Sequence, residues 1–369
     1  MKNFLETKRL PILLTLSMLA VAAIAGVMAV GFDVDNEPRR EKIGFIILGD
    51  IREAGWNASH YNGIKAACDE FNLELLVRDN VEENTGQCPA AIEELINEGV
   101  GMIFLASYSY STEALPIIEA NPDIAFATNS TKQYAKNLTA YFVRMYQGRY
   151  MSGALAGMRT KTNVIGYVAA MPTPEVNRGI NAFALGVKRV NPKAKVLVMW
   201  THSWQDEDVE KQHARRLIVD KHADVIAYHQ DEAAVCDVAD CLGVDFIGYN
   251  AKLAGYSHHC LTSQLCRWDL FYNDIVQRYL KGELNATRNQ WLGMREGVIL
   301  FDGYSELVTP EMRATVERIR AELHDDRLIF IDEIRDNKGQ VRCARGEAIS
   351  DDFLLERINW LVEGVEVID

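Results

Sequence analysis

Residues 42–57 read KIGFIILGDIREAGWN, and the order of residue types in this stretch is the basis for predicting the fold. A short apolar run at 43–48 ends at Gly49 and Asp50, and a helical pattern begins at about residue 57. An apolar strand followed by a polar turn and an amphipathic helix is typical of βαβ units in a parallel sheet. The same succession recurs along the chain, which predicts an α/β protein.

The alternation of strand and helix patterns occurs in two series, one on each side of roughly residue 140. In the first series the expected strands are 43–48, 73–77, 102–106 and 124–128, with helices at 57–70, 89–98 and 112–119. In the second series, after segments at 141–145 and 148–158, the strands are 164–169, 196–200, 225–228 and 246–249, with helices at 175–190, 206–220 and 233–241. Each spacing suits a right-handed crossover, so we expect two Rossmann-like lobes with parallel-type sheets.

The C-terminal third does not contain a third complete series. Segments 261–264 and 271–280 are expected to return to the first lobe, and 298–301 to the second. Later segments predict a helix to about 323, a strand at 328–331, a hairpin with its tip at 337–339 and a helix after 351. These crossings predict a multi-strand hinge, with lobe 1 formed by 41–142 plus about 261–295 and lobe 2 by 143–260 plus about 296–369. Such a hinge permits the lobes to close on a ligand.

The first 40 residues have a different composition from the rest of the chain. Lys2, Lys8 and Arg9 precede an uncharged run at 10–32, which is the order expected of an export signal. The run is long enough to span a bilayer, while Ala23-Ile24-Ala25 resembles a small-residue cleavage site. Segment 1–40 is therefore either a signal peptide or an N-terminal membrane anchor. We expect an exported protein, in the periplasm or on the outer face of the cytoplasmic membrane.

The composition is that of a globular protein with an acidic balance. The chain has 369 residues, which exceeds one ordinary core, and 48% of them are hydrophobic. A formal net charge of −13 argues against a nucleic-acid partner, because binding to phosphate backbones needs clustered Lys and Arg. The seven cysteines lack C-x-x-C spacing, so we expect most of them to be small buried hydrophobes and we expect no metal site.

Candidate binding residues follow the expected strands, because ligands of open α/β sheets bind beyond the carboxyl ends of the strands. The candidates combine aromatic rings with hydrogen-bonding groups, as small-molecule pockets do. They are Trp56, Asn57, Tyr108, Asn129, Glu175, Trp204, His229, Asp231, Asn250 and Trp268. The Trp56 indole offers a flat surface on which a planar ring can stack, although it could equally pack only on its own sheet. Each polar candidate also has an ordinary structural role open to it, such as Glu175 in the first turn of a helix.

Catalytic motifs do not explain these residues. The chain contains no G-x-S-x-G elbow, no H-E-x-x-H pair and no phosphate-binding G-x-x-x-x-G-K-[ST] loop. His229 and Asp231 could share acid–base work, but no nucleophile is indicated beside them. We therefore expect a binding protein without a cofactor, and not an enzyme.

Several motifs together give the chain a family resemblance. They are Gly55-Trp56, GRYMSG at 148–153, IGYVAAMPTPEVNRGINAF at 165–183 and, more weakly, WLVEG at 360–364. With these motifs the chain resembles the basic membrane protein family of ABC-transporter substrate-binding proteins, which includes bacterial purine nucleoside receptors. It looks closest to the branch with Gly-Trp in place of Ser-Phe-Asn after the first strand. The resemblance implies a type I periplasmic-binding fold and uptake of purine nucleosides or bases through a permease and an ATPase.

The resemblance also implies roles for individual residues. Trp56 stands where relatives have the aromatic residue that stacks on the purine. Asn129 and Asn250 stand where nucleoside-binding relatives have aspartates that resemble acceptors for ribose hydroxyls, which favours a free base of the adenine or hypoxanthine type over a riboside. Glu175 and Asp231 remain as acceptors for an exocyclic amino group. The leading hypothesis is thus the solute-binding protein of an ABC importer; alternatives are a membrane-anchored ligand sensor that signals to a partner protein and an exported nucleoside hydrolase.

Overall fold

The computed structural model describes residues 41–52, 55–129, 133–253, 255–284, 290–325 and 329–368. The segment expected to be an export signal or membrane anchor lies outside these residues. Within them, no helix combines the length and the apolar character needed to cross a membrane.

The first sheet has six strands, and all of its pairings are parallel. In spatial order the strands are β11 (Gln290–Leu292), β5 (Leu138–Val143), β4 (Ala125–Asn129), β3 (Met102–Leu105), β1 (Lys42–Ile46) and β2 (Glu74–Arg78). Its helices are α2 (Trp56–Glu70), α3 (Gln87–Asn97), α4 (Tyr110–Glu113), α5 (Leu115–Ala120) and α10 (Trp268–Leu280). Helices cover both faces of a parallel sheet, which is why strands such as β3 are buried along their whole length.

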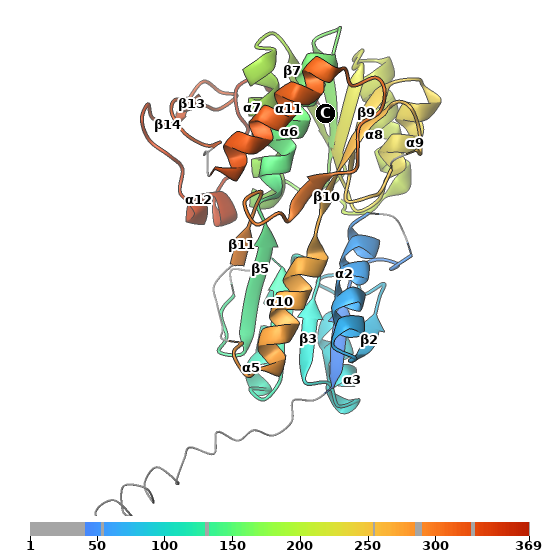
Figure 1. Ribbon diagram of the computed structural model, residues 1–369, viewed down its shortest axis with the longest axis vertical. Helices are drawn as coiled ribbons and strands as arrows, with labels where there is room; N and C mark the ends of the chain where they lie inside the picture. Colours follow the sequence, from blue (N-terminus) through green and yellow to red (C-terminus); the bar gives the residue numbers. More distant parts are fainter. Residues whose placement is uncertain are drawn as a thin grey trace, which may run out of the picture. The chain divides into compact units, whose positions relative to one another are not determined.

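The second sheet has seven strands, of which only the β10–β12 pair is antiparallel. In spatial order the strands are β12 (Ile299–Phe301), β10 (Cys260–Cys266), β9 (Asp245–Tyr249), β8 (Val225–His229), β6 (Val164–Ala169), β7 (Lys195–Trp200) and β15 (Val365–Val367). Its helices are α6 (Met145–Arg159), α7 (Pro174–Val190), α8 (Glu207–Val219), α9 (Ala234–Cys241), α11 (Pro310–His324) and α12 (Asp351–Glu356). A small hairpin of β13 (Ile334–Arg335) and β14 (Val341–Cys343) adjoins this half of the fold (Figure 1).

Two helices of the second half, α6 and α7, pack unusually closely because glycines lie at their contact. A Cβ added to Gly153 would lie 1.9 Å from the carbonyl oxygen of Phe183, and one added to Gly186 would lie 2.0 Å from that of Tyr150. Only glycine allows such an approach of two backbones. Part of the 148–153 and 165–183 motifs is therefore explained by helix packing.

The predicted fold class is confirmed: two parallel-dominated α/β sheets share one chain and are joined by several crossings. The chain passes from β5 into α6, from β10 into α10, and from β11 to β12. β10 pairs with β9 as far as Gln264 and with β12 as far as Cys266, so the return to the first sheet comes a few residues later than the 261–264 segment suggested. The lobe boundaries as a whole stay a prediction.

Some details differ from the expected elements. β11 and β15, each three residues long, were not expected. Of the strand expected at 328–331, residue 328 lies outside the described residues, and Ile331 forms only an isolated bridge to Ala348. These short edge segments are paired by contacts with distant parts of the chain, which local sequence patterns do not encode.

Candidate functional site

A cavity lies where the carboxyl ends of strands from both sheets face each other. The cavity is narrow: the centre of a water-sized sphere can occupy only about 20 Å³ of it. Four lining residues lie at or beyond the carboxyl ends of first-sheet strands, and five belong to the second half of the fold. They are Trp56, Ser107, Tyr108 and Asn129, and Glu175, Trp204, His229, Asp231 and Tyr249.

Trp56 both packs on the first sheet and lines the cavity. It is the first residue of α2, directly after the turn that follows β1, and its side chain is buried. The indole Nε1–H donates a hydrogen bond of 3.0 Å to the carbonyl oxygen of Ala106, which lies just beyond β3. The two roles foreseen for this residue are thus compatible, because one edge of the ring is anchored while the ring contributes to the cavity wall.

The two halves of the fold are in contact at the N-terminus of α2. The backbone N–H of Trp56 donates to the carbonyl oxygen of Asp231 at 3.3 Å. Gly55 has a φ of 130°, and a Cβ at this position would lie 2.0 Å from the same oxygen. The Gly-Trp sequence therefore permits a direct backbone contact between the two sides of the cavity that any other residue at position 55 would obstruct.

The wall formed by the second half contains a neutral histidine beside a carboxylate. His229 Nε2 lies 3.6 Å from Glu175 Oε1 and 3.5 Å from the hydroxyl of Tyr249. Burial lowers the pKa of His229 to about 4, although the hydrogen bond with Glu175 opposes this effect. The imidazole is therefore uncharged at neutral pH and offers one donor and one acceptor.

Asp231 adds a second carboxyl group to this wall. Burial raises its pKa well above the usual range, and the charges that act on it most strongly, on Glu83 and Glu175, are also negative. A group in these surroundings gains from a ligand N–H donor, which stabilises the ionised form. The cavity is therefore better suited to a ligand rich in N–H or O–H groups than to an anion.

Asn129 supplies an acceptor from the opposite side. It is the last residue of β4, only 2% of its surface is exposed, and it lines the cavity. Its Oδ1 atom has no hydrogen-bond partner among the described residues. Because an unpaired buried polar atom is costly, a donor on a bound ligand would stabilise this arrangement.

The other predicted site residues, Asn57, Trp268 and Asn250, do not line the cavity. The side chain of Asn57 is directed at the backbone of the loop after β1, where its Oδ1 accepts a hydrogen bond of 3.2 Å from the N–H of Gly49. Trp268 lies behind Trp56, with 5.4 Å between their ring centroids. Asn250 adopts a φ of 54°, and neither Nδ2 nor Oδ1 of its buried side chain has a hydrogen-bond partner among the described residues. A position after a strand therefore predicted that a residue lies near the cavity, but not that its side chain faces the cavity.

Sequence reasoning did not select two residues that line the cavity, Ser107 and Tyr249. Ser107 directly precedes the candidate Tyr108, and Tyr249 ends β9 directly before the candidate Asn250. Both therefore lie at strand ends, where candidates were expected. Ser107 lines the cavity together with the chosen Tyr108, whereas at the end of β9 the cavity is lined by Tyr249 and not by the chosen Asn250.

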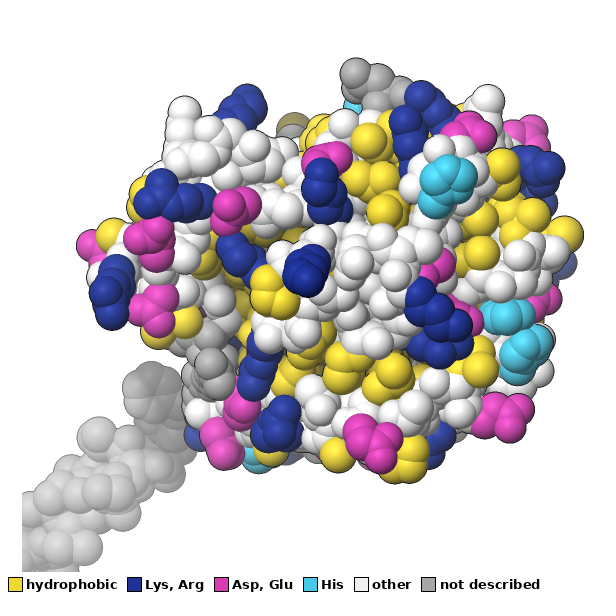
Figure 2. Space-filling model, turned by 90° about the horizontal axis from the view of Figure 1, so that it is seen from above, with side chains coloured by type: hydrophobic (Ala, Val, Ile, Leu, Met, Phe, Trp, Pro, Cys, Tyr) yellow, Lys and Arg dark blue, Asp and Glu magenta, His cyan; other side chains and the backbone are white. Residues whose placement is uncertain are grey.

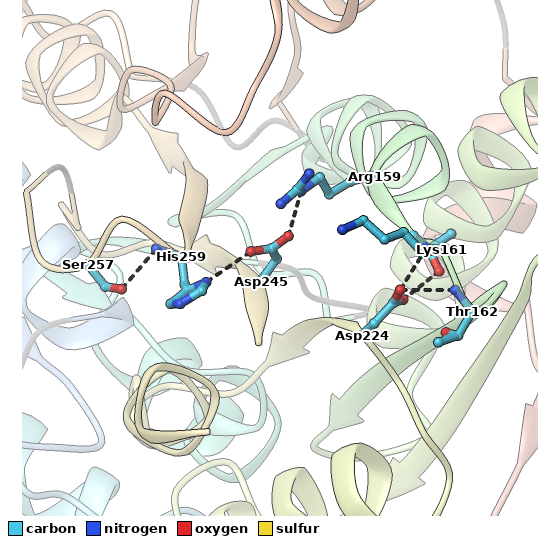
Figure 3. A network of polar contacts seen from close by, with 8 residues as sticks. Arg159, Lys161, Thr162, Asp224, Asp245, Ser257 and His259 are labelled. Atoms are coloured by element: carbon cyan, nitrogen blue, oxygen red, sulfur yellow. Dashed lines mark hydrogen bonds and ion pairs between the residues drawn. The ribbon is translucent and has the colours of Figure 1, made fainter. Parts of the chain in front are cut away.

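Polar contacts also connect residues at the amino ends of the second-sheet strands, the ends that face away from the cavity (Figure 3). Asp245, the first residue of β9, accepts hydrogen bonds from Arg159 Nε at 2.5 Å and interacts with His259 Nδ1 at 3.1 Å. Asp224, just before β8, accepts from the backbone N–H groups of Lys161 and Thr162 at 2.6 and 3.0 Å. These contacts lie at the amino ends of the strands, away from the cavity, and serve the structure. The described residues contain no cluster of His, Cys, Asp and Glu suited to hold a metal ion.

The outer surface carries charges of both signs. Figure 2 shows Lys and Arg side chains interspersed with Asp and Glu over the face seen from above, with apolar side chains between them. Such a mixture is typical of a solvated surface and keeps a protein soluble.

A cavity enclosed between the strand ends of two parallel sheets, with several chain crossings between them, defines a two-lobed binding protein of the type I periplasmic-binding class. Comparison with known proteins gives the family. The model of the family described as ABC transporter substrate-binding protein PnrA-like (Bmp) matches residues 40–337, and the chain belongs to this family.

Individual relatives agree on the class but differ in the ligand that their names state. The chain is 29% identical to a purine-binding protein of Brucella abortus (strain 2308) over 94% of this chain and 99% of the relative. It is 31% identical to the putative ABC transporter glucose-binding protein TsgA13 of Haloferax volcanii over 90% of this chain and 82% of the relative. An ABC transporter solute-binding protein from Aeropyrum pernix K1 has the same fold, with a TM-score of 0.69, 14% identity, and coverage of 85% of this chain and 95% of that one.

Proposed function

We propose that this protein captures a purine base in the cavity between its lobes and delivers it to the permease of an ABC importer. The observation that carries the proposal is the composition of the cavity: aromatic rings from both sides enclose a small space edged by carboxyl and amide groups. Flat heterocycles with N–H groups fit such a site, because rings stack on aromatic side chains and N–H groups pair with oxygen acceptors. The name of the Brucella relative supports the purine assignment.

The edges of the base would be recognised by groups on both sides of the cavity. We assign the stacking surface to Trp56, and the acceptors to Glu175 and Asp231 on one side and Asn129 on the other. An amino group such as that of adenine, together with a ring N–H, would supply donors to these oxygens. A purine that leaves one of them unpaired loses about 1–3 kcal/mol, so the polar edge would provide selectivity and the rings most of the affinity.

A free base fits better than a riboside. The cavity is narrow, with about 20 Å³ open to the centre of a water-sized sphere, and a base with a sugar attached would have to displace more of its lining than the base alone. Asn129 also places an amide in the cavity wall where the resemblance implies a carboxylate for ribose hydroxyls. We therefore expect the adenine or hypoxanthine type of base to bind more tightly than the corresponding nucleosides.

Calorimetric titration tests the proposal. The protein, refolded after removal of any co-purified ligand, would be titrated with adenine, hypoxanthine, guanine and their nucleosides. We expect heat of binding with at least one free base and weaker binding of its nucleoside. An absence of heat with every purine would refute the proposal.

A hexose is the second candidate, because the Haloferax relative is named as a glucose-binding protein. Sugar faces also stack on aromatic rings, and carboxylates accept hydrogen bonds from hydroxyl groups. D-Glucose therefore belongs in the same titration series, and binding of glucose without binding of any purine would favour this reading.

We further propose that the protein is exported and that segment 1–40 directs it to the membrane. Mass determination of the native protein separates the two forms of this proposal. A cleaved N-terminus would indicate a free periplasmic receptor, whereas an intact segment that fractionates with membranes would indicate an anchored receptor or a ligand sensor.

A further inference from the structure

Behind Trp56, a histidine and a second indole contact its ring and each other. The centroid of the His60 ring lies 4.1 Å from that of Trp56 and 3.8 Å from that of Trp268, and the two indole centroids are 5.4 Å apart, so the three rings form a triangle. His60 has no exposed surface, and Trp268 is 1% exposed. Trp56 is the member of this triangle that reaches the cavity, so the other two rings form its support.

Hydrogen bonds fix the rotation of the histidine ring. His60 Nδ1 lies 2.6 Å from the hydroxyl of Tyr272, and that hydroxyl accepts a hydrogen bond of 3.0 Å from Tyr141. Either tautomer of His60 forms this short contact with Tyr272, as donor or as acceptor at Nδ1, so the rotation of the ring is fixed in both cases. Burial holds the pKa of His60 well below its usual range, so the ring stays neutral.

The support draws on three elements that lie close together around the crossings of the chain. His60 belongs to α2, Tyr141 to β5, and Trp268 and Tyr272 to α10. α2 and α10 lie side by side (Figure 1), and a Cβ added to Gly63 of α2 would lie 2.9 Å from the Cβ of Trp268. The glycine thus permits the close approach that brings the three rings into contact.

We propose that His60 is a positioning residue for the ligand, because it sets the orientation of the Trp56 ring on which the ligand stacks. This inference rests on the proposed function. The Trp56 indole has one hydrogen-bonding group, the Nε1–H that donates to Ala106, and the ring could pivot about this bond if its inner face were not supported. The contact with His60 blocks that movement, and the chain from Tyr141 through Tyr272 holds His60 itself in place.

Two readouts test the proposal, the first without any ligand. The near-UV circular dichroism that Trp56 contributes is the difference between the wild-type spectrum and that of Trp56→Leu. We expect this contribution to be largely lost in a His60→Leu background and reduced by Tyr272→Phe. Tyr304→Phe is the matched control, because it removes a tyrosine hydroxyl bonded to Glu317 far along the chain, and it should leave the contribution unchanged.

The second readout is the affinity for adenine, measured by calorimetry in a double-mutant cycle. We expect His60→Leu to weaken binding about tenfold when Trp56 is present and by less than about twofold in the Trp56→Leu background, since residues that act through one another are non-additive. Equal weakening in both backgrounds, or a Trp56 signal that survives His60→Leu, would overturn the inference. If wild type fails to bind adenine while the Trp56 signal is lost in His60→Leu, the proposed ligand is refuted and the positioning of Trp56 by His60 is supported.

Discussion

Replacing Gly55 with alanine should hinder closure of the cavity without removing any group proposed to contact the ligand. The added Cβ would lie 2.0 Å from the carbonyl oxygen of Asp231, whereas ordinary contact begins at 3.4 Å. The difference, 3.4 − 2.0, requires the two sides to separate by about 1.4 Å at this point. The obstructing atom is backbone, so it cannot rotate away as a flexible side chain would.

The expected magnitude follows from the contact that this separation breaks. The hydrogen bond from the Trp56 N–H to the same oxygen is already 3.3 Å long and would no longer form. Loss of such a bond costs about 0.5–1.5 kcal/mol, and residual strain in the closed form adds to it. A total of about 1–2 kcal/mol corresponds to roughly 5- to 30-fold weaker ligand binding.

A positive φ at position 55 would also strain alanine in the unliganded protein, and a control substitution accounts for part of this effect. Gly86 has a φ of 84° and a ψ of 0°, with no atom within 4 Å of an added Cβ, so Gly86→Ala places alanine at a positive φ without a contact between the two sides. Gly55, with a φ of 130° and a ψ of −140°, lies in a region that is harder for alanine to adopt, so the unfolding free energy of Gly55→Ala would be measured as well. Affinity would be measured by calorimetry and closure by the ligand-induced decrease in radius of gyration in small-angle X-ray scattering. If Gly55→Ala binds the ligand as tightly as Gly86→Ala does, Gly55 has no role in closure and the reasoning is refuted.

Three further predictions concern stacking, titration and structural support. Trp56→Leu should weaken binding of a purine base by about 1–3 kcal/mol, the usual worth of stacking a base on an aromatic side chain, and calorimetric affinity within twofold of wild type would contradict this. Burial raises the pKa of Glu210 to about 8 from 4.5, so the folded protein binds a proton there that the unfolded chain releases, and stability should fall as pH rises from about 4.5 through 8. Glu210→Gln should therefore raise the melting temperature at pH 8 and not at pH 4, and an equal effect at both values would exclude the titration. Asp245→Asn should lower the free energy of unfolding by about 1–3 kcal/mol, because the charged hydrogen bond to Arg159 is lost, and denaturant unfolding measures this; a changed ligand affinity would show that the network of Figure 3 reaches the cavity.

The principal strands could be predicted from the sequence because parallel strands are buried on both faces and appear as short apolar runs. β6 (Val164–Ala169) spans the predicted range 164–169, and the burial of its side chains explains why the run is apolar. The position of the cavity followed from the same pattern, since Trp56 follows the loop after β1 and His229 ends β8, at the carboxyl ends of the two sheets. Local chemistry thus determined the sheets and the edge at which they form a site.

Only the tertiary structure decided which side chains face that site. Trp268 and Asn57 lie near Trp56 but do not line the cavity. The packing of α10 against α2 places Trp268 behind the Trp56 indole, and the side chain of Asn57 accepts a hydrogen bond from the backbone N–H of Gly49. Tyr249 faces the cavity where the neighbouring Asn250 does not line it. The contact of Trp268 with His60 and Trp56, and the contact of Gly55 with Asp231, join residues far apart in the chain. Such contacts depend on how helices and lobes approach one another, which residue periodicity along a single segment does not specify.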